Sequence, residues 1–265
     1  MSWSRGLLAA VLLAVWGCGP PELDTSSGPA LVESLALLEE SIDPDRREAF
    51  REAIAYLTDD ATVGIEVGPV EPFLGAFAPF EGLTAEAILT AAWMRRVDDL
   101  RERIADLDAR SRTGAAAQSL IDRVELSDVR LFPVAEGNLE RPLVEAVVQN
   151  GTRSTVFGIS FQLSLRPAHE ETPWVVEVAD RPIGRGLPPG QRASIRFELA
   201  DSRWNRALEA EPDTVFLCGV VRLQGSRNRV LAATEYGPTD AYLHQLWTQQ
   251  LKTLLNDPPA GVSVS

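Results

Sequence analysis

The sequence contains very little lysine, histidine or cysteine. Among its 25 basic residues only Lys252 is a lysine, and there are two histidines and two cysteines in 265 residues. A zinc site needs several His or Cys ligands at short spacings, and neither H-x-x-x-H nor C-x-x-C occurs. The phosphate-binding motifs G-x-x-x-x-G-K-[ST] and G-x-G-x-x-G are also absent. We therefore expect no metal site and no bound cofactor.

The scarcity of histidine also argues against nucleophilic catalysis. A Ser-His-Asp triad would need His169 or His244 as its base. His169 falls in a polar stretch typical of a solvated loop, and His244 lies beside Leu243 in an apolar helical pattern. The acidic pairs Asp59–Asp60 and Asp98–Asp99 are adjacent in sequence, which does not create the spacing of a glycosidase site. We expect a protein that is not an enzyme and assign no catalytic residue.

The sequence also has a deficit of positively charged residues. Acidic residues outnumber basic ones by 38 to 25, which gives a net charge of −13. A body this acidic repels phosphate backbones, so nucleic acid is a poor partner. Hydrophobic residues make up 45% of the chain, enough for one or two domains with apolar cores.

The N-terminus has the three parts of a secretory signal, and residues 1–17 are predicted to be a signal peptide. The apolar run Gly6–Trp16 would span about 16 Å as a helix, against about 30 Å for a bilayer core. Its end resembles a bacterial lipobox, with Val15 and Gly17 before Cys18 as the site of lipid attachment. Trp16 departs from the usual small residue, and an ordinary cleaved signal is the alternative. Gly19 in place of Asp favours the outer membrane of the cell envelope, on its periplasmic side.

Cys218 has no intramolecular partner if Cys18 carries lipid. It lies in the apolar run 215–221, where a free cysteine behaves as a small buried hydrophobe. A reactive or intermolecular role is the alternative.

The rest of the chain predicts a tether over residues 18–29 and a helical domain over residues 30–113. Leu31, Val32, Leu35 and Leu38 mark the apolar face of a first helix. A second helix is expected from Pro44 to about Leu57. A third, capped by Thr84, is expected over residues 85–111 and ends at Thr113–Gly114. Residues 59–82, rich in Gly and Pro, predict a packed irregular loop, with a functional lid as the alternative.

A β-domain is predicted over residues 120–236. Seven short strands in about 110 residues favour an antiparallel immunoglobulin-like β-sandwich. Alternation in the third strand predicts one buried and one solvated face. The dipeptide Asn150–Gly151 predicts a hairpin turn, which we favour over its reading as a glycosylation sequon. The expected strands are Val124–Phe132, Leu143–Asn150, Thr155–Leu165, Trp174–Val178, Ala193–Leu199, Thr214–Leu223 and Arg229–Glu235.

A C-terminal helix is predicted over residues 239–256. Its wide apolar stripe includes Leu243, Leu246, Trp247 and Leu251 and must be covered by the protein itself or by a partner. A short helical link is expected at Ser202–Ala210. The fold class is therefore α+β: an N-terminal helical bundle, a β-sandwich and a C-terminal helix.

Several of these segments together resemble a family of bacterial lipoproteins of uncharacterised function. The resemblance implies a helical N-terminal domain, an immunoglobulin-like β-domain and an envelope location, and it implies no catalytic residues. It rests on Arg141–Leu165, Thr172–Val175 and Gly186–Gly190, and on Gly82, Thr84, Ala85, Glu86, Ile88 and Ala91.

Three functions remain open at this point. The first is a non-enzymatic envelope lipoprotein, held at the membrane by lipid on Cys18, that binds an envelope protein. The second is a hydrolase built from carboxylates, which requires two acids converging in a cleft. The third is a carrier of an apolar ligand, which requires an apolar cavity of several hundred Å³.

Overall fold

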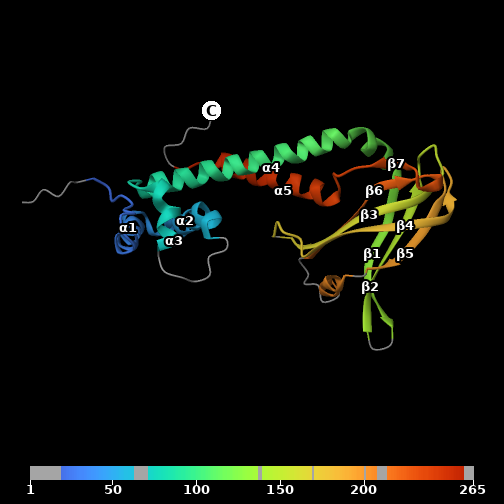
Figure 1. Cartoon of the computed structure of the whole chain (residues 1–265), viewed down its shortest axis with the longest axis horizontal. Coiled ribbons are helices and arrows are strands. Elements are labelled where there is room, and N and C mark those ends of the chain that lie inside the picture. Colours follow the sequence, from blue (N-terminus) through green and yellow to red (C-terminus); the bar gives the residue numbers. More distant parts are fainter. Residues whose placement is uncertain are drawn as a thin grey trace, which may run out of the picture. The chain divides into compact units, whose positions relative to one another are not determined.

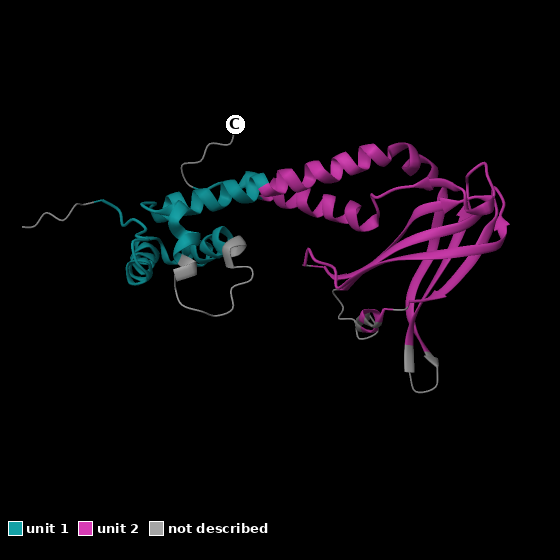
Figure 2. Ribbon diagram, in the orientation of Figure 1, with its two compact units in different colours: residues 1–98, 254–265 teal, residues 99–253 magenta. Residues whose placement is uncertain are grey.

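The computed structural model describes residues 19–62, 71–136, 139–168, 170–199, 201–207 and 214–259. The predicted signal peptide and Cys18 lie outside these residues. The fold is mixed α+β, with N-terminal helices, antiparallel sheets of three and four strands, and a C-terminal helix (Figure 1). The chain divides into two compact units (Figure 2): the described residues up to Asp98 and from Leu254 form unit 1, and Asp99–Thr253 form unit 2.

Unit 1 consists of short helices around one apolar core. Its elements are α1 (Gly28–Ser41), the 3-10 turn η1 (Pro44–Arg46), α2 (Arg47–Thr62), α3 (Glu71–Phe77), the 3-10 turn η2 (Ala78–Phe80) and the first part of α4 (Ala85–Ile121). Ser27 caps α1 by accepting a hydrogen bond from the Ala30 N–H, which satisfies one of the free donors at a helix start. The core includes Leu31, Leu38, Phe50, Leu57, Phe77 and Ile88.

Part of the segment expected to be a flexible tether is packed instead. Leu23 is 1% exposed, its N–H donates to the Leu83 carbonyl at 2.9 Å, and its carbonyl accepts from the Gly82 N–H at 2.8 Å. The Asp24 N–H donates to Ser34 Oγ at 3.0 Å. Ser34 therefore faces inward from α1 and is 6% exposed, whereas Val32, which we expected on the buried face, is 65% exposed.

The stretch 59–82 is more helical than its Gly and Pro content predicted. Residues 63–70 lie outside the described residues, but α2 continues to Thr62 and α3 begins at Glu71. Pro72 occupies the first turn of α3, where its missing N–H costs nothing. Phe77 is buried in the core of unit 1, so the expected packing of this stretch is confirmed there, and the expectation of an irregular chain is wrong for residues 59–62 and 71–80.

Helix α4 does not end at Thr113–Gly114 as predicted but continues to Ile121, over 37 residues. A single glycine inside a helix costs only about 1 kcal/mol, so tertiary contacts can override it. A Cβ at Gly114 would lie 2.7 Å from Thr234 Oγ1. Gly114 therefore permits a close approach to the chain after the last strand. On the same helix, Asp106 and Arg110 form an ion pair at 3.1 Å.

Unit 2 contains all seven predicted strands in two antiparallel sheets. The first sheet has the order β1-β2-β5 and the second β4-β3-β6-β7. Both β1 and β2 extend further than expected and pair from Val124↔Asn150 to Glu136↔Leu139. The strands are β1 (Val124–Glu136), β2 (Leu139–Asn150), β3 (Val156–Pro167), β4 (Val175–Leu187), β5 (Arg192–Glu198), β6 (Thr214–Gln224) and β7 (Val230–Ala233).

The two sheets contribute side chains to one core. Phe161 of β3 and Phe197 of β5, from different sheets, stack with ring centroids 5.5 Å apart. Trp204, on the 3-10 turn η3 (Ser202–Ala207), is fully buried in the same core. Its indole N–H donates to Glu177 Oε2 at 2.7 Å, which satisfies the polar end of a buried tryptophan. The predicted helical link thus supplies a core residue.

Asn150–Gly151 is not a hairpin turn, because β2 and β3 belong to different sheets. The Asn150 side chain is fully buried and ties two inter-sheet connections together. Its amide nitrogen donates to the carbonyls of Ser154 at 2.9 Å and Leu187 at 2.7 Å, and its amide oxygen accepts from the Thr152 N–H at 2.9 Å. All polar atoms of the amide are used inside the protein, so the structure leaves no room for a glycan there.

The face of β3 that we expected to be solvated is also buried. Ser160 and Ser164 are at most 1% exposed. The start of α5 (Pro238–Asn256) covers this face: Thr239 Oγ1 donates to Ser164 Oγ at 2.9 Å. The small polar residues of β3 therefore form the surface against which the start of α5 packs. Within the described residues, no helix is both long enough and apolar enough to span a membrane.

Arg166, at the end of the same face, is a fully buried cation. Its guanidinium carbon lies 4.1 Å from the centroid of the Tyr242 ring on α5. Both terminal guanidinium nitrogens lack a hydrogen-bond partner. Desolvating a charge is costly unless something replaces the lost hydration, and a stacked aromatic face supplies about 2 kcal/mol or more at a desolvated site. The Tyr242 ring is thus the main stabilising contact of this charge.

We predict that Tyr242→Ala lowers the free energy of unfolding by about 2–4 kcal/mol, because it leaves a buried charge uncompensated. Tyr242→Phe keeps the ring and loses only the long 3.3 Å hydrogen bond to the Ala168 carbonyl, so it should cost no more than about 1 kcal/mol. Urea unfolding of the two variants checks this. Equal losses in both would show that the hydroxyl, not the ring, is the important group.

Candidate ligand pocket

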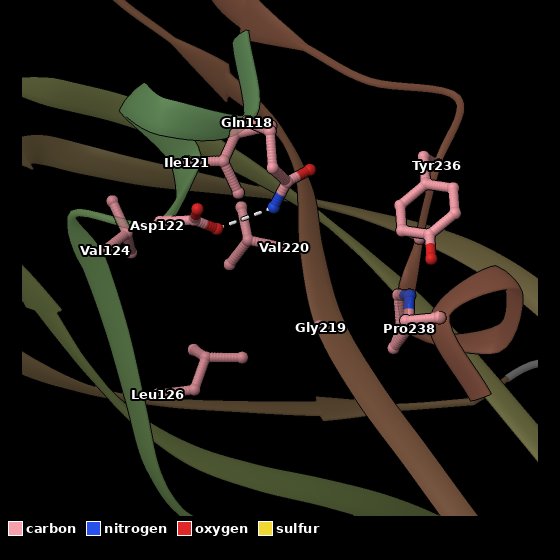
Figure 3. A pocket seen from close by; sticks show the side chains of 11 residues that line it. Gln118, Ile121, Asp122, Val124, Leu126, Gly219, Val220, Tyr236 and Pro238 are labelled. Atoms are coloured by element: carbon pink, nitrogen blue, oxygen red, sulfur yellow. Dashed lines mark hydrogen bonds between the residues drawn. The ribbon is translucent and has the colours of Figure 1, made fainter. Parts of the chain in front are cut away.

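A pocket of about 270 Å³ lies in unit 2, where the end of α4 meets β1, β6 and the linker into α5. In Figure 3, Gln118 and Asp122 lie on one side and Tyr236 and Pro238 on the other. The walls are mostly apolar, which is typical of a binding site with a few polar groups. The lining residues are Gln118, Ile121, Asp122, Val124, Leu126, Gly219, Val220, Tyr236, Gly237, Pro238 and Ala241.

Gln118 lines this pocket and has an unused hydrogen-bond acceptor that solvent does not reach. Its amide nitrogen donates at 2.6 Å to Oδ1 of Asp122, the residue that follows the end of α4. This bond orients the amide, so the other end of the group is its oxygen. Gln118 Oε1 is inaccessible to solvent and has no hydrogen-bond donor. Leaving a buried acceptor unsatisfied costs about 1–3 kcal/mol, so a ligand that turns the Gln118 amide until Oε1 faces the pocket, and donates one hydrogen bond to it, would recover this loss.

Tyr236 places a neutral phenol on the opposite side. Burial raises the pKa of Tyr236 above its usual value, and the negative charges of Asp240 and Asp108 raise it further. The hydroxyl is therefore protonated at physiological pH. The backbone around it is also held, since the Tyr236 N–H donates to Thr234 Oγ1 at 3.0 Å.

Close packing fixes the linker that forms the roof of the pocket. A Cβ at Gly219 would lie 3.0 Å from Pro238 Cγ, and one at Gly237 would collide with the Gln162 side chain. The Gly237 N–H donates to Asp240 Oδ2 at 2.8 Å, and Asp240 Oδ1 accepts from Arg110 Nη1 at 2.9 Å. The linker that forms the roof therefore packs against β6 and β3, and an ion pair connects it to α4.

A second pocket, of about 460 Å³, lies in unit 1. Its floor is apolar and includes Leu89 and Trp93, and the Trp93 indole N–H donates to the Leu254 carbonyl at 3.0 Å. Two carboxylates and two guanidinium groups line it: Glu52, Asp257, Arg46 and Arg96. Arg46 forms a two-bond ion pair with Glu86, and Arg96 stacks on Tyr56 at 4.7 Å. Both arginines are thus engaged in other contacts.

The structure places the residues singled out from the sequence as follows. Cys18 and His169 lie outside the described residues. His244 lies on α5, where its Nε2 is 3.0 Å from Asp108 Oδ1 on α4, so it links two helices. Cys218 forms no disulfide within the described residues. Among those residues there is also no group of three or more His, Cys, Asp or Glu side chains that could hold a metal ion.

The pocket residues were not identified from the sequence. Gln118 and Tyr236 occur in no motif, and the chain between them is more than a hundred residues long. The expected helix end at Gly114 also placed Gln118 outside any helix. No pattern in the sequence marks these two residues, because only the folding of β1, β6 and the linker brings them together.

Comparisons of the chain with protein-family models, with curated proteins and with solved structures find no match.

We predict that Cys218 is unreactive in the folded protein. Burial raises its pKa to about 12, and only the thiolate is the nucleophile. At pH 8 the thiolate is then about one part in ten thousand, against roughly a tenth or more for an unfolded cysteine. In the chain beginning at Gly19, Cys218 is the one thiol, so iodoacetamide labelling should be slow until denaturant is added. Rapid stoichiometric labelling at pH 8 without denaturant would contradict the burial.

Proposed function

We propose that the protein is a lipid-anchored lipoprotein of the bacterial envelope whose β-domain is a non-enzymatic binding module. The anchor is the lipid on Cys18, and the envelope location follows from the signal and lipobox in residues 1–18. The binding site is the pocket between α4, β1, β6 and the start of α5.

We also propose that the two sheets form an immunoglobulin-like sandwich. The support is the strand order together with the shared core. The connections β2–β3, β4–β5 and β5–β6 pass from one sheet to the other. The connections β1–β2, β3–β4 and β6–β7 are hairpins within one sheet. This resembles the constant-type immunoglobulin arrangement except that the fourth strand pairs with the third. Such sandwiches are common recognition modules, although the fold alone does not define a function.

The observation that carries the binding proposal is Gln118 Oε1, a buried acceptor without a donor on a residue that lines a mostly apolar pocket. Its complement is an apolar group that carries one hydrogen-bond donor. The pocket, at about 270 Å³, is slightly smaller than the ~300–1,000 Å³ typical of sites for drug-sized ligands. An inserted side chain therefore suits it better than a lipid chain, and this favours the protein-binding hypothesis over the apolar-ligand carrier.

Tryptophan and tyrosine meet both requirements, since each has a large apolar ring and one polar hydrogen. They are also enriched among the residues that dominate protein–protein binding energies. We therefore propose that an aromatic side chain of an envelope protein inserts here, turns the Gln118 amide toward the pocket and donates to its Oε1. Pro238 and Val220 would contact its ring.

The pocket proposal is tested with N-acetyl-tryptophanamide as a probe. We expect the probe to bind with a millimolar dissociation constant. The binding is measured from the NMR chemical-shift changes of the Gly219 and Gly237 amides. The N1-methyl analogue lacks the indole donor and should bind about fivefold or more weakly. In Gln118→Leu this preference should disappear while the protein stays folded. A wild-type protein that binds both probes equally, or neither, would refute the role of Gln118.

The anchor is tested separately by metabolic labelling with a fatty-acid analogue. We expect the wild-type protein to be labelled and Cys18→Ser to be unlabelled and released from membranes, because several acyl chains are needed for durable attachment. Unlabelled wild-type protein would show that residues 1–18 are an ordinary signal or none.

A further inference from the structure

One end of the β region carries a concentration of arginine that contrasts with the acidic chain. We call this the basic end and define it as residues 122–125, 149–157, 184–192 and 222–230. It contains seven arginines and two acidic residues, Asp122 and Glu125, a net charge of +5 within a chain of −13. The rest of the chain therefore carries −18. The arginines are Arg123, Arg153, Arg185, Arg192, Arg222, Arg227 and Arg229.

The hydrogen bonds of the fold bring these segments together at the right-hand end of the sheets in Figure 1. Asn150 joins the β2–β3 and β4–β5 connections, since its N–H donates to the Gln191 carbonyl and its carbonyl accepts from the Gly190 N–H. The Gly151 N–H donates to the Arg123 carbonyl at 2.8 Å. The pairing of Gly158 with Gln224 places the β6–β7 turn at the same end.

All seven side chains belong to exposed residues, and none forms an ion pair with a described carboxylate. Arg192 donates to the neutral amide of Gln149. Two arginines elsewhere on the same sheets do form ion pairs, Arg196 with Glu145 at 3.0 Å and Arg141 with Glu198 at 3.1 Å. The basic end is thus a cluster of arginines whose charge no ion pair compensates.

Two exposed apolar side chains lie among these arginines. Phe157 is 36% exposed and Val230 is 54% exposed. Phe157 packs beside Gly186, next to Arg185, since a Cβ at Gly186 would contact its ring. Val230 directly follows Arg229 at the start of β7. Phe157 is the one aromatic among the large hydrophobic side chains that are exposed in the described part of the chain.

We propose that the basic end is a membrane-contact surface that binds anionic phospholipid headgroups. Arginines near an anionic bilayer each contribute about 1 kcal/mol, and their effect falls off within a Debye length of about 8 Å. The end that faces the bilayer therefore binds although the remaining chain is acidic. Phe157 and Val230 favour a bilayer over a soluble polyanion, because only a bilayer offers an interface where apolar side chains leave water.

The proposal is tested by vesicle sedimentation with the chain from Gly19 to Ser265, which contains both cores and no lipid. The vesicles are phosphatidylcholine alone, or phosphatidylcholine with about a third phosphatidylglycerol. We expect at least tenfold stronger binding to the anionic vesicles at ~50 mM salt and loss of that difference at ~500 mM salt.

Variant R153Q/R229Q should lose about fivefold in partitioning for each arginine removed. The control R112Q/R130Q removes two exposed arginines outside the basic end and should bind as the wild type does. Val230→Ser should weaken binding to both kinds of vesicle by a few fold. All variants are checked for unchanged thermal unfolding.

Equal binding of the wild type to neutral and anionic vesicles would overturn the proposal, as would equal losses in R153Q/R229Q and R112Q/R130Q. A third contrary result is binding to soluble polyphosphate that depends on Arg153 and Arg229 without binding to vesicles, which would assign the surface to a polymer. None of these outcomes affects the pocket at Gln118, because the variants leave its polar groups unchanged.

Discussion

Thr239 and Asp240 connect the three parts of unit 2, which are α4, the β-sheets and α5. Thr239 donates to Ser164 on β3, while Asp240 accepts from Gly237 at the start of α5 and pairs with Arg110 on α4. Asp240 is 8% exposed, so its charge is largely withdrawn from water and depends on these partners. This arrangement holds α5 against the sheet and against α4. The pocket roof, the buried face of β3 and the stacking of Arg166 on Tyr242 all depend on it.

The binding proposal and the membrane proposal use different physical properties of the same unit. The pocket at Gln118 has an unsatisfied acceptor in a mostly apolar environment, and the proposed binding would discriminate among ligands by a hydrogen bond. The basic end has unpaired charge beside exposed apolar side chains, which favours a surface rather than a defined ligand. A module that contacts the membrane at one surface and a partner at another would be suited to a lipid-anchored envelope protein.

The elements with a strong local period were predictable. Short apolar runs between turn signals identified the seven strands, two of them with clear alternation, and α5 was expected within one residue of its observed start. The errors arose where long-range contacts override local propensity. Gly114 stays helical because Thr234 packs against it, and Ser160 and Ser164 are buried because α5 covers them. Asn150–Gly151 has the composition of a hairpin turn, but the side chain of Asn150 instead joins two connections between the sheets.

The sequence alone determined the approximate positions of the strands, the α+β order and the prediction of an anchor at Cys18, because each depends on short-range pattern or composition. The tertiary structure decided which strands share a sheet, which polar residues are buried, and how distant residues meet. Gln118 and Tyr236 form a pocket, and seven arginines form one end, only because the strands cross between sheets. Such contacts produce no periodic pattern in the sequence, because each of them joins residues that lie far apart along the chain.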